Sequence, residues 1–74
     1  MNEKQILSLY KKLSLVTNPI EEARTHADIV LLETGSENQA RDKEIEVLQK
    51  RWSSSLSEVD RLRIDRRIQE IFNS

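Results

Sequence analysis

The sequence predicts an all-α fold, a compact bundle of about four short antiparallel helices. The 74-residue chain has one glycine and one proline, so it offers almost no turn chemistry for β-hairpins. Residues that favour helices, chiefly Leu, Glu, Lys, Arg, Gln and Ala, dominate the composition. Apolar residues recur at helical spacing, and only a few residues separate one such stretch from the next. Short connections of this kind favour antiparallel neighbours.

The first helix is predicted over residues 3–15. Four apolar residues follow the i, i+3, i+4, i+7 spacing of one helical face: Ile6, Leu9, Tyr10 and Leu13. The second helix is predicted over residues 19–34. Pro19 keeps Asn18 out of the α region and suits the first helical position, so Asn18 is the expected N-cap. Gly35 is expected to end this helix, because glycine adopts the left-handed conformation without a Cβ penalty.

The third helix is predicted over residues 37–52, since Ser36 and Gln39 have the spacing of a capping box. Ile45, Leu48 and Trp52 lie on one stripe of this helix. Trp52 is therefore expected in the core.

The fourth helix is predicted over residues 56–72. Two N-terminal caps fit the sequence, either Ser55 with Glu58 or Ser57 with Asp60. The expected core stripe consists of Ile64, Ile68, Ile71 and Phe72.

Length and composition predict one small domain over residues 1–74, in which self-association or a partner adds to a limited core. The chain has no cysteine, which favours a reducing compartment such as the cytoplasm. No apolar run approaches the roughly 20 residues of a bilayer span, and the first residues lack the pattern of a signal peptide. We expect no association with a membrane.

Catalysis has little support in the sequence. His26 is the only histidine, there is no thiol, and one glycine cannot form a glycine-rich phosphate loop. We therefore expect neither an enzyme nor a small-molecule substrate. Glu22, His26 and Glu33 share one side of the second helix, but their spacing is not that of helical di-metal sites, so we expect a solvated polar flank and no metal or cofactor.

Several apolar residues lie away from the stripes named above. On the second helix, Ile29 and Leu32 point away from the face that carries Ala23 and Ala27, and on the fourth helix Val59 and Leu62 lie away from the stripe. Two interpretations stay open. The second helix is central and has neighbours on both sides, or these residues belong to an exposed patch that docks a partner.

The sequence thus favours a non-catalytic protein–protein interaction module, a small regulator or inhibitor that docks an apolar helical face on a partner protein or on a second copy of itself. The candidate partner-binding residues are the apolar anchors Ile29, Leu32, Val59 and Leu62, with Arg63, Arg66 and Arg67 as a charged rim.

The first alternative is a nucleic-acid-binding regulator that uses the arginine-rich fourth helix. Acidic residues at i+3 and i+4 from the arginines are expected to pair with them, and the net charge of −1 offers no general attraction to phosphate. The second alternative is a structural subunit of a homo-oligomer.

Overall fold

A computed structural model describes residues 3–55 and 57–73. Over these residues it contains four helices and no strand: α1 (Glu3–Leu15), α2 (Pro19–Thr34), α3 (Glu37–Ser54) and α4 (Glu58–Asn73). The predicted all-α class and four-helix bundle are confirmed. Helix α3 continues past Trp52, and α4 continues past Phe72. The predicted first residue of the fourth helix, Leu56, lies outside the described residues.

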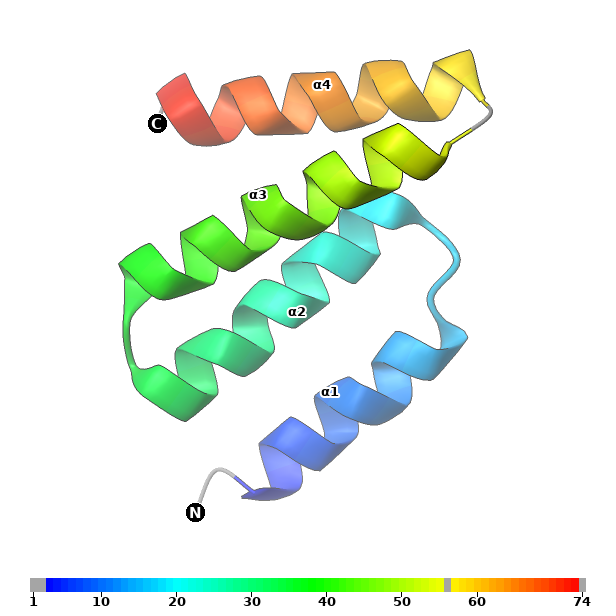
Figure 1. The fold of residues 1–74 in the computed structure, drawn as a ribbon. Coiled ribbons are helices and arrows are strands. Elements are labelled where there is room, and N and C mark those ends of the chain that lie inside the picture. Colours follow the sequence, from blue (N-terminus) through cyan, green and yellow to red (C-terminus); the bar gives the residue numbers. More distant parts are fainter. Residues whose placement is uncertain (1–2, 56, 74) are drawn as a thin grey trace.

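The helices follow one another side by side, with α1 and α4 at opposite edges (Figure 1). Helices α2, α3 and α4 all contact one another, whereas α1 contacts only α2. The molecule is accordingly flat, with extents of 40 × 27 × 15 Å. Helix α1 therefore lies outside a core built by the other three helices.

The ends of α2 follow from local chemistry. The side-chain oxygen of Asn18 accepts a hydrogen bond of 2.8 Å from the backbone N–H of Ile20, as an N-cap does. At the other end, Gly35 has φ 69° and its N–H donates to the carbonyl of Leu31 at 2.8 Å. Both predicted boundaries of α2 are confirmed.

The caps of α3 and α4 are serine hydroxyls. The N–H of Gln39 donates to Ser36 Oγ at 3.2 Å, as predicted, whereas the N–H of Ser36 donates to Thr34 Oγ1 at 3.1 Å instead of to Gln39. For α4, the N–H of Asp60 donates to Ser57 Oγ at 3.3 Å. Of the two predicted caps for this helix, the structure therefore has Ser57 with Asp60.

The core is aliphatic. Its buried cluster consists of Ala23, Val47, Leu48, Ile64 and Ile71, against which Ile20, Ile45 and Ile68 pack. The prediction that Trp52 belongs to this core is wrong, because the side of α3 that faces α2 and α4 is centred on Val47 and Leu48, and Trp52 is 39% exposed.

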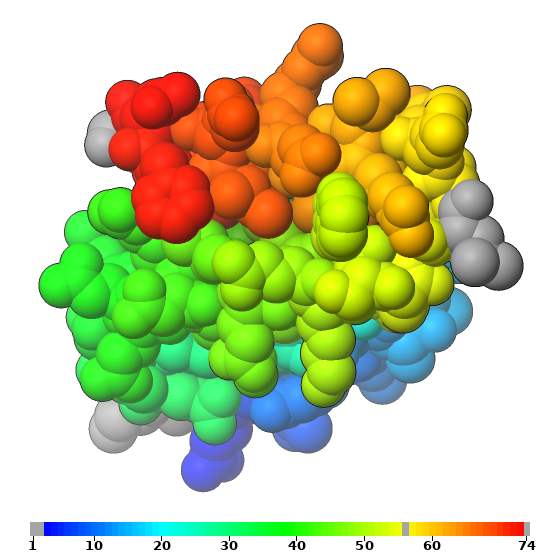
Figure 2. Space-filling model, turned by 45° about the horizontal axis from the view of Figure 1, so that its top comes forward, coloured from blue at the N-terminus to red at the C-terminus, as the bar shows by residue number. Residues whose placement is uncertain are grey.

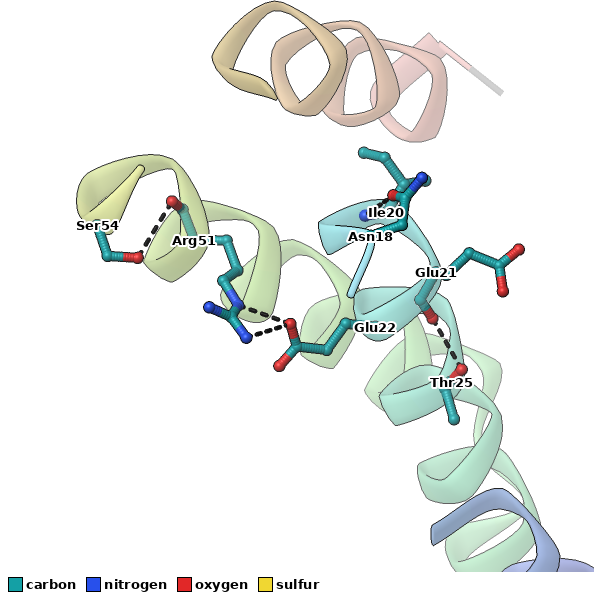
Figure 3. A network of polar contacts seen from close by, with 7 residues as sticks. All are labelled: Asn18, Ile20, Glu21, Glu22, Thr25, Arg51 and Ser54. Carbon is teal, nitrogen blue, oxygen red and sulfur yellow. Dashed lines mark hydrogen bonds and ion pairs between the residues drawn. The ribbon is translucent and has the colours of Figure 1, made fainter. Parts of the chain in front are cut away.

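A polar contact joins α2 to α3 beside this core. Arg51 Nε and Nη2 each lie 2.6 Å from Glu22 Oε2, and the side chains point toward each other across the two helices (Figure 3). Glu22 is therefore already paired with a cation. Among the described residues no group of three or more His, Asp or Glu side chains lies together in a way that would hold a metal ion.

Candidate protein-interaction surface

Four of the seven predicted partner-binding residues lie together on the outer side of α4. Val59 and Leu62 are 58% and 69% exposed, and with Arg63 and Arg66 they line one surface depression. They point away from Ile64 and Ile71, through which α4 enters the core. We call these four residues the α4 outer face.

The described part of the chain forms no ion pair with Arg63 or Arg66, the arginines of the α4 outer face. The prediction that the arginines of this helix pair with acidic residues along the helix is wrong for both. The α4 outer face thus combines apolar side chains with two uncompensated cations, and in Figure 2 side chains of α4 project from the edge that faces away from α3.

Arg67 does not belong to this rim. Its Nε and Nη2 donate to the two carboxylate oxygens of Glu44 on α3, at 2.7 and 3.3 Å. Glu44 is buried, and these hydrogen bonds raise the pKa of the Arg67 guanidinium. Arg67 lies on the side of α4 that faces α3 and neutralises a buried carboxylate. This ion pair joins α3 to α4, so Arg67 is a structural residue.

The prediction that Ile29 is an exposed anchor is also wrong. Ile29 is 3% exposed, and Leu32 on the same side of α2 is half-buried. Both lie on the side of α2 opposite Ala27. Glu21 lies on that side too and pairs with Lys12 of α1, which makes α1 the neighbour there. Of the two interpretations of α2, the structure supports the one with neighbours on both sides, and it separates Ile29 and Leu32 from the α4 outer face.

The aromatic side chains lie outside the core. The prediction that Phe72 belongs to the core stripe of α4 is wrong, because Phe72 is 61% exposed. The chain has one Tyr, one Trp and one Phe, and Tyr10, Trp52 and Phe72 all have large exposed areas. Trp52 borders the seam between α3 and α4, where the guanidinium of Arg61 lies 4.8 Å from the centre of its ring. Aromatic and arginine side chains are the types most enriched at binding hot spots. Their chemical type was the signal in the sequence that indicated a role at an interface. For Trp52, the helical spacing to Ile45 and Leu48 favoured a place in the core instead.

The described surface therefore offers apolar side chains beside cations, on helices whose backbones are held by the core. No described helix is both long and apolar enough to cross a bilayer. Compared with known proteins, the chain matches no family model, no curated protein and no solved structure.

Proposed function

We propose that this chain is a non-catalytic, cytoplasmic protein-interaction module that docks the α4 outer face on an acidic surface of another protein. One observation carries the proposal. Val59 and Leu62 are more than half exposed on the side of α4 that points away from the core. They are flanked by Arg63 and Arg66, neither of which forms an ion pair with another described residue. Apolar anchors with a charged rim are the usual composition of a helical interface.

The charges favour a different protein over a second copy at this face. In a two-fold contact between two copies, Arg63 and Arg66 of each chain would face the same arginines of the other, and like charges repel. The exposed side of α1 on a second copy offers no acidic alternative, because Lys4 and Lys11 accompany Leu7 there. A partner that places carboxylates around an apolar patch satisfies both parts of the α4 outer face.

The same residues argue against nucleic acid as the partner. Arg61 and Arg67 are engaged with Trp52 and Glu44, which leaves two of the four arginines of α4 for an external ligand. Four acidic residues share the helix, namely Glu58, Asp60, Asp65 and Glu70. Phosphate binding depends on an excess of cations, which this helix lacks.

The test compares two variants of the α4 outer face with a matched control. In Leu62→Lys and in the double variant Arg63→Glu/Arg66→Glu, we expect the captured partner to bind at least about tenfold more weakly, because anchors and desolvated charges dominate interface energies. The control is Leu15→Lys on α1, which alters a leucine that is 82% exposed and leaves binding unchanged.

The measurement is affinity capture with the unmodified chain and the three variants, followed by calorimetric titration of the purified partner at two salt concentrations. The proposal requires a protein that both α4 variants lose and the control retains, with binding that weakens as salt increases. A chain whose only captured ligand is nucleic acid, released by Arg63→Glu/Arg66→Glu, overturns the proposal in favour of the alternative. A partner that binds Leu62→Lys at full affinity also overturns it.

A further inference from the structure

Helix α1 is attached to the molecule through one neighbour. None of its described residues is buried, and its apolar stripe, Ile6, Leu9 and Leu13, is half-buried against α2. An ion pair joins Lys12 Nζ of α1 to Glu21 Oε2 of α2 at 3.8 Å, and both side chains are about half exposed. Exposed pairs contribute little, and segments with few buried contacts open at low free energy.

The surface beneath α1 is well formed. We call Thr25, Ile29 and Leu32 the α2 outer face. Thr25 and Ile29 are both buried. They lie on the side of α2 that carries Glu21, whose carboxylate pairs with Lys12 of α1. The hydroxyl of Thr25 donates to the carbonyl of Glu21 at 2.8 Å, so its hydrogen bond is made within α2 and does not depend on α1 (Figure 3). When α1 leaves, an apolar strip is exposed without a broken hydrogen bond at Thr25.

The charges of the two helices indicate what this strip accepts. Apart from Glu22, which pairs with Arg51 of α3, helix α2 carries Glu21, Asp28 and Glu33 against the single cation Arg24. Helix α1 carries three lysines against one glutamate. The α2 outer face therefore fits a basic amphipathic helix. Helix α1 is the segment of this chain with that chemistry.

We propose that the α2 outer face accepts α1 from a second copy, so that two chains pair by exchanging their N-terminal helices. The exchanged contacts are the same as those within one chain, so the two forms differ only in the link between α1 and α2 and in the entropy of association. The link consists of residues 16–18, and the capped start of α2 fixes Asn18. Val16 and Thr17 are the hinge. The closed single chain prevails when dilute, because its own α1 is present at high effective concentration.

The first test supplies α1 as a separate molecule. A fluorescein-labelled peptide of residues 3–16 is titrated with the full chain and with a Leu9→Lys/Leu13→Lys chain, whose own α1 is weakened. Anisotropy should show saturable binding that is at least tenfold tighter to the variant chain. A peptide carrying the same two lysines is the control and should not bind. A folded variant chain that fails to bind the unmodified peptide overturns the proposal.

The second test changes the hinge. Helices joined in an antiparallel pair need a loop of about 2–5 residues, so deletion of Val16 and Thr17 prevents α1 from folding back on its own α2. Light scattering should find this chain as a dimer, and a chain with Gly-Ser-Gly inserted after Thr17 as a monomer. Adding Ile29→Lys to the deletion should restore the monomer, whereas adding Leu62→Lys should not. This last comparison separates the exchange from docking through the α4 outer face.

A hinge-deleted chain that stays monomeric with α2–α4 folded overturns the exchange. Hydrogen exchange of the unmodified chain tests whether α1 detaches from α2, and it does not depend on the folding of any variant. The amides of α1 should exchange faster than those of α2, α3 and α4. Protection of α1 equal to that of the other helices contradicts a detachable α1 and overturns the proposal.

Discussion

Helices α1 and α3 differ in how well their apolar sequence pattern predicts the burial of their side chains. Helix α1 has the plainest apolar stripe in the sequence, yet none of its described residues is buried. Helix α3 is strongly charged, yet it buries Ala40, Glu44, Val47 and Leu48. The difference lies in the neighbours, since α3 contacts α2 and α4 whereas α1 contacts only α2. The number of neighbours, which periodicity does not report, determines how deeply a face is buried.

This comparison implies two levels of stability within one small chain. Helices α2, α3 and α4 share the buried cluster and should unfold together, whereas α1 has only half-buried contacts to lose. An isolated helix of 13 residues is marginal in water, so α1 depends on its contact with α2.

The largest expected effect tests this difference directly. Leu48 is fully buried, and Leu48→Ala should lower the free energy of unfolding by about 3 kcal/mol through lost burial and the cavity left behind. Leu9→Ala on α1 should cost about 1 kcal/mol, because Leu9 is half-buried. Urea denaturation followed by circular dichroism measures both. Equal losses would mean that α1 is as well packed as α3.

The second prediction compares the ion pairs of the two regions. Glu44→Ala removes the partner of Arg67 beside the core and should cost about 2 kcal/mol, less than for a fully buried pair because part of Arg67 reaches solvent. Lys12→Ala removes the exposed pair with Glu21 and should cost under about 0.5 kcal/mol. A double-mutant cycle with Arg67→Ala isolates the coupling of the buried pair. A coupling as small as that of Lys12 with Glu21 would show that solvent screens both pairs alike.

Sequence reasoning predicted the features that depend on local chemistry. Asn18 before Pro19, the single glycine and the serines before α3 and α4 each act within four residues on the chain. Their effects on the backbone are the same whatever the helices later pack against. The helix order and the antiparallel connections follow from these boundaries.

The features that were missed depend on contacts between distant residues. Arg67 pairs with Glu44, which lies 23 residues earlier in the sequence, so no residue spacing within α4 predicts this ion pair. Ile29 is buried because α1 folds back over α2, and a helical wheel of α2 alone cannot distinguish a side that α1 covers from one that faces solvent. On the α4 outer face, the prediction that Val59 and Leu62 are exposed is confirmed, because that side of α4 has no neighbour among the described helices. A helical wheel therefore predicts exposure correctly at the edge of the molecule and fails in its middle, and whether a partner binds Val59 and Leu62 stays a prediction.

The smallest expected effect compares the two links that flank α2. Gly35 has a left-handed backbone, and no atom lies within 4 Å of the place where a Cβ would stand, so the cost of Gly35→Val is purely conformational, about 1–2 kcal/mol. Gly35→Asn should cost less, because asparagine tolerates this conformation. Thr17→Val in the hinge between α1 and α2 should change stability by under about 0.5 kcal/mol, because Thr17 is exposed and has no left-handed backbone. The denaturation midpoints of the three variants measure the contrast. A loss at Thr17 as large as that at Gly35 would show that both links are tightly constrained.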